Sequence, residues 1–329
     1  MSRVSILGAG AWGTALALSL AQKQPVTLWS HTHAAAARLG GTRRNDDYLP
    51  GFELPESIHV TADLAEAATS EILLCVVPSQ HMRSTMEALR PSLRSTHILV
   101  SATKGIEQLT FLRMSEVMQQ AANRPLRMAV LSGPSFAQEV AQHMPTAITI
   151  ASTDPAVAQQ IQRQFSGPSL RLYTNDDVIG VELGGALKNV IALSAGVVAG
   201  LSLGANSAAA LITRGIAEIT RLAVACGGRQ ETLAGLSGVG DLVLTCTGSL
   251  SRNRTVGLEL GAGRKLPEIL QGLNGKTAEG VHSTTAALGL ARMHGVEMPI
   301  TEQMAAILHE GKSPMTAIHE LMSRPGRDE

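Results

Sequence analysis

Lys188 lies in a nearly continuous apolar, glycine-containing run near the middle of the chain, residues 181–191 (VELGGALKNVI). Burying an ammonium group without a partner costs on the order of several kcal/mol, so such a lysine reaches solvent, pairs with an acid or takes part in chemistry. The chain holds only six lysines against twenty-one arginines. Because arginine supplies most of the positive charge, a lysine here favours a specific role, with an ordinary ion-paired or solvent-reaching helix lysine as the alternative.

Two further charged residues stand in apolar surroundings. Lys104 follows directly on the apolar residues 98–103, and Asp241 is a lone carboxylate in the run 237–247. A carboxylate in such a run needs a partner, and a lysine is the obvious one. Ammonium groups can stabilise negative charge that develops on an oxygen during a reaction, and one of them can donate a proton to it. A purely structural ion pair is the alternative for Asp241.

A third group comes directly before a predicted helix and consists of Ser251, Arg252 and Asn253. A capping hydroxyl, the unpaired N–H groups of a helix start and a guanidinium are the ingredients of a phosphate site. A plain capping segment explains the same residues without a ligand.

Gly8, Gly10 and Gly13 follow a short apolar strand, residues 4–7, and open a predicted helix over residues 14–22. In this context glycines allow a tight turn, a close approach of the backbone to a pyrophosphate, and tight packing of helix on strand. The start of the chain also resembles a secretory signal, but the glycines interrupt its apolar stretch. We therefore predict a dinucleotide site, with a merely structural turn as the alternative.

The next predicted strand, residues 26–29, leads into residues 30–33 (SHTH) rather than into the carboxylate that holds the ribose 2′-hydroxyl of NAD. Without that carboxylate a 2′-phosphate is not repelled, and three arginines follow downstream: Arg38, Arg43 and Arg44. We therefore predict that NADP(H) is accepted and serves at least as well as NAD(H). For each arginine, a solvated surface position is the plain alternative.

Apolar runs without polar alternation predict strands buried on both faces of a parallel sheet. They are residues 71–77, 98–103, 128–132 and 147–151, followed by a short strand at 170–173, with predicted helices at 80–89, 110–122, 136–142 and after residue 155. Strands that alternate with helices indicate a doubly wound α/β sheet, in which ligands bind beyond the carboxyl ends of the strands. That rule places the glycine loop and residues 78–79, 104–105 and 132–135 along one edge.

From about residue 178 the strand signals end and helical periodicity follows, in residues 207–225, 255–260, 283–293 and 302–308. A chain of 329 residues favours two domains. We expect a Rossmann-like dinucleotide-binding domain over residues 1–177 and an all-α substrate-binding domain over residues 178–329. Residues 190–213 are uncharged and long enough to span a membrane, but glycines and serines divide them, which predicts two packed helices and no span.

The composition argues against several classes of partner. The formal net charge is zero, the isoelectric point is about 7.2 and aromatic residues make up 2% of the chain, so nucleic acids and anionic membranes are poor candidates. Cys75, Cys226 and Cys246 are odd in number and lack metal-ligand spacing. We therefore expect reduced thiols, a cytoplasmic location and no metal site.

Together these motifs resemble the NAD(P)-dependent glycerol-3-phosphate dehydrogenases, in particular the bacterial cytosolic biosynthetic type. The resemblance extends to about residue 320 and is carried by residues 8–15, 102–105, 132–137, 184–190, 240–246 and 251–254. It implies the reversible reduction of dihydroxyacetone phosphate to sn-glycerol 3-phosphate, the backbone precursor of phospholipids, with NADPH or NADH as the hydride donor.

Carried over position by position, the resemblance implies that Lys188 is the catalytic acid/base, with Lys104 assisting and Asp241 supporting the lysines. The implied substrate contacts are Lys104, Gly133, Ser135, Lys188, Asn189, Asp241, Thr245, Ser251, Arg252 and Asn253. The implied cofactor contacts are Gly8, Gly10, Ala11, Trp12, Gly13, His31, Lys104, Ala137, Arg252 and Glu279. The chain departs from the common pattern at Ala11, where a hydroxyl residue is frequent, and at Val281 and His282, where an aromatic and a basic residue are frequent.

Two other functions stay open. A two-domain NAD(P)-dependent dehydrogenase of hydroxy acids or of a sugar acid would share this organisation, but it would not require the phosphate-binding group 251–253 together with Lys104. A non-catalytic dinucleotide sensor would share the fold as well, but it has no need of buried ammonium groups. The expected partner is a small-molecule substrate, and the sequence leaves the oligomeric state open, a homodimer included.

Overall fold

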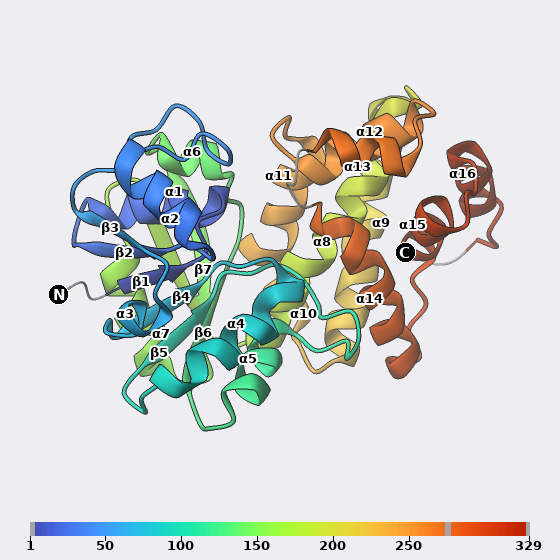
Figure 1. Ribbon diagram of the computed structural model, residues 1–329. Helices are drawn as coiled ribbons and strands as arrows, with labels where there is room; N and C mark the ends of the chain where they lie inside the picture. The colour runs from blue at the N-terminus through green and yellow to red at the C-terminus, as the bar shows by residue number, and fades with distance from the viewer. Residues whose placement is uncertain (1–3, 274–277, 327–329) are drawn as a thin grey trace. The chain divides into compact units, whose positions relative to one another are not determined.

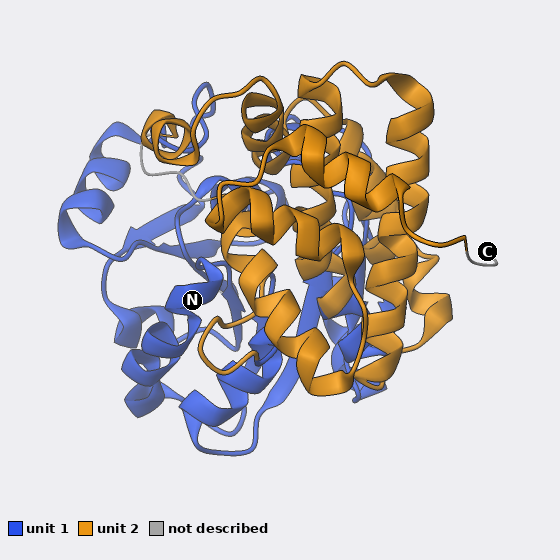
Figure 2. Ribbon diagram, turned by 90° about the vertical axis from the view of Figure 1, so that its right-hand side faces the viewer, with its two compact units in different colours: residues 1–104, 112–182 blue, residues 105–111, 183–329 orange. Residues whose placement is uncertain are grey.

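The computed structural model describes residues 4–273 and 278–326. Its contacts divide the chain into two compact units, Met1–Lys104 with Leu112–Glu182 and Gly105–Phe111 with Leu183–Glu329 (Figure 2). The segment Gly105–Phe111 therefore belongs to the second unit, although both segments that flank it belong to the first. Helix α8 (Val178–Gly200) begins where the domain boundary is expected, and the contacts divide the chain within that helix.

The first unit is built on one eight-stranded sheet with helices packed on it, which confirms the predicted doubly wound α/β class (Figure 1). In chain order the strands are β1 (Val4–Leu7), β2 (Val26–Trp29), β3 (Ile58–Thr61), β4 (Ile72–Cys75), β5 (Ile98–Ser101), β6 (Arg127–Ser132), β7 (Thr146–Ala151) and β8 (Leu170–Asn175). Across the sheet their order is β3-β2-β1-β4-β5-β6-β7-β8. The order reverses between β1 and β4, and ligands of such sheets bind beyond the strand ends at this point.

Successive strand residues point into different cores, as expected for a sheet covered on both faces. Ile6 and Leu74 belong to one buried apolar cluster, while Leu7 and Leu73 belong to another. Burial of each such side chain stabilises the fold by about 1.5 to 3 kcal/mol. The helices of this unit are α1 (Ala11–Ala21), α2 (His33–Thr42), α3 (Leu64–Ala67), α4 (Met82–Leu89), α5 (Met114–Ala122), α6 (Ala137–Ala141) and α7 (Pro155–Phe165).

Two features of the sheet differ from the prediction. Strand β3 was not predicted, because its four residues IHVT include a polar His59 and give only a weak strand signal. Strand β7 pairs antiparallel with β6, with Leu131 opposite Ile150, whereas a parallel arrangement was expected. The connection between them contains only the five-residue α6, which packs against α1, so it turns back at the end of the sheet instead of crossing its face.

From Leu183 onward, the described residues of the second unit form helices joined by turns and loops, as predicted, whereas Gly105–Phe111 forms no helix. Besides most of α8 it contains α9 (Gly204–Ala225), α10 (Gln230–Leu233), α11 (Asp241–Thr247), α12 (Arg252–Gly261), α13 (Leu266–Gly272), α14 (Glu279–His294), α15 (Pro299–His309) and α16 (Pro314–Met322). A single π-helical turn, Leu236–Gly240, leads into α11. The uncharged residues 190–213 form the end of α8 and the first part of α9, which confirms the prediction of two helices.

Helix α8 is by itself long and apolar enough to cross a membrane. The bent helix pair Gln230–Thr247 and Arg252–Gly261 meets the same test when its two parts are taken together. The most apolar window of α8 is 83% buried. Burial of this kind is also found in the central helix of a globular unit.

Glycines allow α8 and α12 to approach closely. A Cβ atom added to Gly257 would lie 1.9 Å from the carbonyl oxygen of Leu193, and one added to Gly196 would lie 2.1 Å from that of Arg254. The backbones therefore touch where these residues cross, and no larger side chain fits between them. This contact fixes the register of α8, which carries Lys188, against α12.

Candidate active site

The glycine loop after β1 has the geometry of a dinucleotide site. Gly8 has φ +125°, and a Cβ atom there would lie 2.7 Å from the carbonyl oxygen of Val76; at Gly13 it would lie 1.9 Å from that of Gly8. At Gly10, the N-cap of α1, a Cβ atom would meet nothing within 4 Å. The first and third glycines are thus required by the fold, while the second leaves open space at a helix start, where N–H groups can hold a phosphate. These residues fit the pyrophosphate of NAD(P).

Two residues beside the loop belong to the same predicted contact set. Ala11 is the first residue of α1, and Trp12 follows it, half-buried against the core of the sheet. The indole Nε1 of Trp12 is buried and has no hydrogen-bond partner in the described part of the chain. A buried donor of this kind is costly unless a ligand or water completes it.

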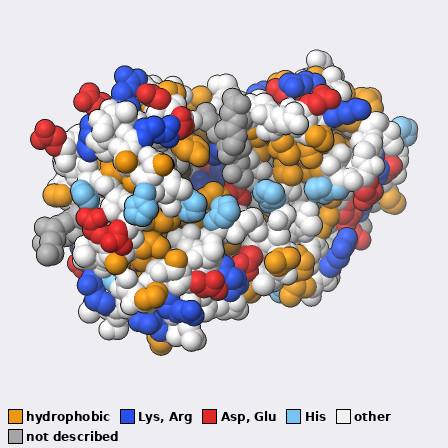
Figure 3. Space-filling model, in the orientation of Figure 1, with side chains coloured by type: hydrophobic (Ala, Val, Ile, Leu, Met, Phe, Trp, Pro, Cys, Tyr) orange, Lys and Arg blue, Asp and Glu red, His pale blue; other side chains and the backbone are white. Residues whose placement is uncertain are grey.

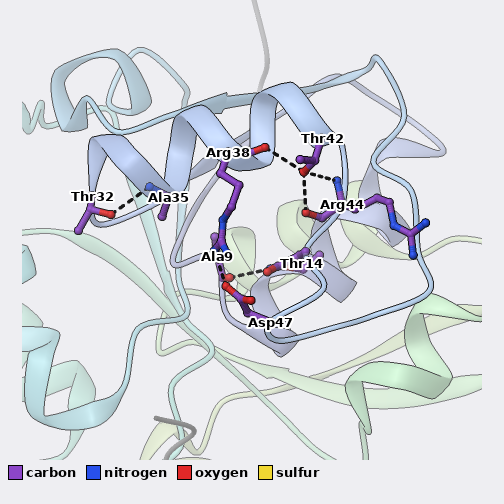
Figure 4. Close-up of polar contacts among 9 residues, drawn as sticks. Ala9, Thr14, Thr32, Ala35, Arg38, Thr42, Arg44 and Asp47 are labelled. Atoms are coloured by element: carbon purple, nitrogen blue, oxygen red, sulfur yellow. Dashed lines mark hydrogen bonds and ion pairs between the residues drawn. The ribbon is translucent and has the colours of Figure 1, made fainter. Parts of the chain in front are cut away.

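Beyond β2, the three arginines predicted near a 2′-phosphate, Arg38, Arg43 and Arg44, form contacts within the protein. His31 is exposed and lies edge-on to the ring of Trp29, 6.4 Å between centroids. Arg43 donates to three backbone carbonyls, those of Leu54, Pro55 and Ile58, so its guanidinium is part of the fold. Arg38 pairs with Asp47 (Figure 4), and Arg44 pairs with Asp46. These two exposed pairs contribute little stability. That NADPH serves at least as well as NADH stays a prediction.

At the edge of the sheet the structure brings Lys104, Gly133 and Ser135 together. Lys104 Nζ donates to the Gly133 carbonyl oxygen at 2.9 Å, and Ser135 Oγ donates to the same oxygen at 2.9 Å. Gly133 has φ +134°, and a Cβ atom there would lie 3.0 Å from Ile148 Cα, so this position requires glycine. Ala137, a predicted cofactor contact, is the first residue of α6.

In the second unit Lys188 forms the predicted ion pair with Asp241, which confirms that a lysine is the partner of this carboxylate. Lys188 Nζ also donates to Thr245 Oγ1 at 2.7 Å, and that hydroxyl in turn donates to the Asp241 carbonyl at 2.7 Å. Lys188 is 6% exposed and Asp241 is fully buried. The ammonium therefore lies in an apolar environment where its charge is balanced and its direction is fixed by two groups of one helix, α11.

A second hydrogen-bonded group joins three helices of this unit. Asn253 Nδ2 on α12 donates to Asn189 Oδ1 on α8 at 2.9 Å, and the N–H of Gly280 on α14 donates to Asn253 Oδ1 at 3.0 Å. A Cβ atom on Gly280 would lie 2.7 Å from the Asn189 carbonyl oxygen. Gly280 was not predicted as a site residue. In this segment only its neighbour Glu279 was named, and a glycine in one sequence gives no sign of a close backbone contact.

The phosphate-site candidates lie at the start of α12. Ser251 is its N-cap and accepts a hydrogen bond from the N–H of Arg254 at 3.2 Å, which confirms the predicted capping. Arg252 is the first residue of the helix, and its side chain is exposed to solvent. Crowding by protein atoms lowers the pKa of Arg252, and the charge of Glu279 opposes this shift. Because the Arg252 side chain is exposed to solvent, a ligand can reach its guanidinium.

Two of the cysteines, Cys75 and Cys246, are buried and take no part in these groups as thiolates. Burial raises the pKa of Cys75 and of Cys246 to about 12. The three cysteines of the chain, all described by the structure, form no disulfide. The thiols of Cys75 and Cys246 are therefore protonated at neutral pH.

Comparison with known proteins covers both units. The model of the NAD-dependent glycerol-3-phosphate dehydrogenase N-terminus matches residues 3–158, and that of the C-terminus matches residues 177–319. The glycerol-3-phosphate dehydrogenases [NAD(P)+] of Acidobacterium capsulatum and Koribacter versatilis are 58% and 56% identical to the chain. All of the chain is covered in both comparisons, with 100% and 99% of the respective relatives.

Solved structures agree with this assignment. The glycerol-3-phosphate dehydrogenase of Coxiella burnetii is 42% identical, with a TM-score of 0.94 over 98% of both chains. A ketopantoate reductase from Ralstonia eutropha is 13% identical to the chain, with a TM-score of 0.62, and this is a likeness of fold alone. With both family models and these relatives matched over nearly the whole length, the chain belongs to the NAD-dependent glycerol-3-phosphate dehydrogenase family.

Proposed function

We propose that the chain catalyses the reversible reduction of dihydroxyacetone phosphate to sn-glycerol 3-phosphate with NADPH or NADH, and that Lys188 is its general acid/base. The observation that carries the proposal is the buried Lys188 ammonium, paired with Asp241 and bonded to Thr245. A buried charge held so firmly is poorly explained by stability alone, since apolar residues in the same volume would often serve as well. A proton source for a ketone oxygen is the chemistry it suits.

The chain's own residues would act as follows. Lys188 donates a proton to the ketone oxygen as that oxygen gains negative charge, and it takes the proton back in the reverse direction. Lys104, held on the Gly133 carbonyl, adds a second positive charge for this oxygen. Asp241 and Thr245 are positioning groups that fix the direction of the Lys188 ammonium.

The bound NAD(P)H supplies the hydride. Gly8, Gly10 and Gly13 would hold its pyrophosphate, with Ala11, Trp12, His31 and Ala137 beside it. On the second unit, Arg252 and Glu279 are further proposed cofactor contacts. The start of α12, with Ser251, Arg252 and Asn253, would hold the substrate phosphate, since it combines a cation with helix N–H groups.

In the cell this reaction supplies the glycerol phosphate backbone of phospholipids. We place it in the cytoplasm, because the balanced charge gives no attraction to anionic membranes and the buried thiols suit a reducing compartment.

The decisive variant is Arg252→Ala. Charged hydrogen bonds to a phosphate contribute about 1.5 to 3 kcal/mol, so kcat/KM for dihydroxyacetone phosphate should fall by about ten- to a few hundredfold. The rate with unphosphorylated dihydroxyacetone should be very low in the wild type and barely changed in the variant. Both are measured by the absorbance of the reduced nicotinamide, with each of the two cofactors.

Arg264→Ala is the matched control, because Arg264 is an exposed arginine just beyond the other end of α12 and pairs only with the surface residue Glu259 among the contacts described. Equal loss with both substrates in Arg252→Ala would show that this arginine acts through the cofactor or the fold and does not hold the substrate phosphate. Wild-type inactivity toward dihydroxyacetone phosphate, with activity toward a hydroxy acid or sugar acid, would overturn the proposed reaction.

A further inference from the structure

Asn45 lies between the end of α2 and β3, yet its side chain contacts the glycine loop. Its Nδ2 donates to the Ala9 carbonyl oxygen at 2.9 Å and to Thr14 Oγ1 at 2.7 Å. These two residues, labelled in Figure 4, flank Gly10 on the two sides of the α1 start. Both hydrogens of the amide are thereby used. Asn45 is 3% exposed and Thr14 is 1% exposed, so these bonds are shielded from water.

The segment that carries Asn45 is itself rigid. The Asn45 carbonyl accepts the N–H groups of Tyr48 and Leu49, which closes a turn, and Leu49 and Leu54 are buried in the core of the sheet. The three carbonyl bonds of Arg43 fasten the same segment from its other side. Asn45 is therefore a fixed support against which the glycine loop rests.

The direction of one peptide group follows from this contact. Ala9 and Gly10 share a trans peptide bond, in which the carbonyl and the N–H point to opposite sides. When Asn45 holds the Ala9 oxygen, the Gly10 N–H must point away from Asn45. Gly10 is the N-cap of α1, so its N–H has no acceptor within the helix, and the space beside its Cα is open.

We propose that Asn45 is a positioning residue of the cofactor site, which orients the Ala9–Gly10 peptide so that an N–H, and not a carbonyl oxygen, faces the pyrophosphate. With the peptide turned over, the carbonyl dipole would repel the phosphate oxygens, and one N–H donor would be lost. The inference rests on the proposed placement of the pyrophosphate at Gly10. Because NADH and NADPH share the pyrophosphate, Asn45 should affect the binding of both cofactors equally.

The test is the dissociation constant of NADPH and of NADH, measured by calorimetry on the full-length protein without substrate. Asn45→Leu keeps the branched shape but removes both donors and adds no charge. We expect both dissociation constants to rise by about ten- to a hundredfold, with their ratio unchanged. Unchanged binding of both cofactors in this variant would overturn the proposal.

Ser5→Ala is the matched control that separates a positioning role of Asn45 from a merely structural one. Ser5 is fully buried in β1, just before the loop, and its hydroxyl bonds to Ala67 and Ser70 and not to the loop. This variant also loses buried hydrogen bonds, so its unfolding temperature should fall, while its cofactor dissociation constants should stay within about threefold of the wild type. If Ser5→Ala weakened the cofactors as much as Asn45→Leu, general loosening of the unit would explain the effect and the proposal would fail.

Thr14 provides a second variant pair in case Asn45→Leu does not fold. Thr14→Ser keeps the hydroxyl that accepts from Asn45, whereas Thr14→Val removes it at nearly the same volume. We expect normal cofactor binding in the first and a loss of about three- to tenfold in the second. Equal binding by both variants would contradict the proposal.

Gly10→Val tests the placement of the pyrophosphate separately. The φ of −76° and ψ of −175° at Gly10 suit any L-residue, and its Cβ would meet nothing within 4 Å, so the fold accepts the side chain. The side chain would occupy the space assigned to the phosphates, and binding should fall by about a hundredfold. Normal binding in Gly10→Val would overturn both the placement and the inference, whereas weak binding there with normal binding in Asn45→Leu would overturn the inference alone.

Discussion

At the residue scale, the Lys188 ammonium has a direction that its two partners on α11 determine, and this geometry suits a proton donor. The ammonium pairs with the buried Asp241 and donates to Thr245, both on α11. Thr245 is fixed in turn by its bond to the Asp241 carbonyl. A group whose position is determined by two neighbours needs little reorganisation when charge develops beside it, which is the basis of electrostatic catalysis.

We predict that Lys188→Ala lowers kcat by about two to four orders of magnitude, because a general acid/base commonly contributes that much. Cofactor binding should survive, since the glycine loop belongs to the other unit of the chain. Steady-state kinetics and a dissociation constant for NADPH measure the two effects. The matched control is Lys265→Ala, an exposed lysine that precedes α13 and should behave as the wild type. Near-normal turnover of Lys188→Ala would remove this residue from the mechanism.

Sequence reasoning could find Lys188 and Asp241 because a charge within an apolar run is visible along the chain. Asn45 gives no such signal, since it stands among polar residues in RRNDD. Its contacts are 31 and 36 positions away, with Thr14 and Ala9. Arg43 was interpreted as a candidate for a 2′-phosphate, yet its guanidinium bonds to backbone carbonyls, because one sequence cannot tell a solvated arginine from one that fastens a loop.

At the scale of elements, the crossing of α8 and α12 depends on glycine. Gly257 contacts the Leu193 carbonyl so closely that a methyl group would overlap it at 1.9 Å. The helices would have to separate, and that would also shift Asn253 against Asn189, which are bonded across the same pair. Overpacking of this kind typically costs about 1 to 3 kcal/mol.

Gly257→Ala should therefore lower the urea midpoint of unfolding and reduce kcat/KM for dihydroxyacetone phosphate. The same substitution at Gly272 is the control, because that residue lies in α13 with nothing within 4 Å of an added Cβ. There alanine has the better helix propensity, by up to about 1 kcal/mol, and the midpoint should stay level or rise. A midpoint that changed equally in both variants would show that the α8–α12 contact tolerates a methyl group.

Helix α15 begins at Pro299 and has no side-chain cap of its own, but Glu218 of α9 supplies one. Its carboxylate accepts the N–H of Ile300 at 2.6 Å and the N–H and hydroxyl of Thr301 at 3.3 and 3.2 Å. Glu218 is 2% exposed. Burial raises its pKa to about 7, and the hydrogen bonds and Arg221 only partly oppose this shift.

The sign of the pH effect follows from the raised pKa. The native carboxyl binds its proton more tightly than the unfolded one, whose pKa is about 4.5, so the resulting stability is fully present below that pH and is lost as pH rises towards about 7. The change is on the order of 3 kcal/mol at most. Glu218→Gln does not titrate, and its amide oxygen can still accept the N–H of Ile300. Relative to this variant, the wild type should lose urea resistance between pH 4.5 and 7.5.

Glu302→Gln is the control for this comparison, because Glu302 is an exposed carboxylate in the first turn of the same helix. Its unfolding midpoint should follow the wild type at every pH. Parallel pH profiles of wild type and Glu218→Gln would mean that the native Glu218 titrates at its ordinary pKa.

The positions of most strands could be predicted from the sequence, but their direction and their contacts with distant segments could not. Apolar runs locate β4, β5 and β6 well, because strands buried on both faces need continuous apolar residues. The same runs carry no direction, which is why the antiparallel pairing of β7 with β6 was missed. The assignment of Gly105–Phe111 to the helical unit was equally hidden, since it follows from contacts such as that of Phe111 with Gly289, far apart in the sequence.

At the scale of the whole molecule, charge is balanced. The chain has 27 basic and 27 acidic residues, and both signs are interspersed over the face drawn in Figure 3. Long-range attraction of an anionic substrate requires a net or clustered positive field. The phosphate of dihydroxyacetone phosphate should therefore be attracted chiefly by local cations such as Arg252.

The expected result is a weak dependence of kcat/KM on ionic strength. Between about 20 and 200 mM salt the screening length falls from roughly 20 to 7 Å, which reduces long-range attraction but leaves direct contacts in place. We expect kcat/KM for dihydroxyacetone phosphate to fall by about two- to fivefold at saturating NADPH, and Arg252→Ala to lose most of that dependence because the exposed guanidinium is its main source. Unphosphorylated dihydroxyacetone, which is neutral, controls for effects of salt on the protein itself. A decline of more than about tenfold that persisted in Arg252→Ala would show that charges elsewhere on the molecule steer the substrate, against the balance of its composition.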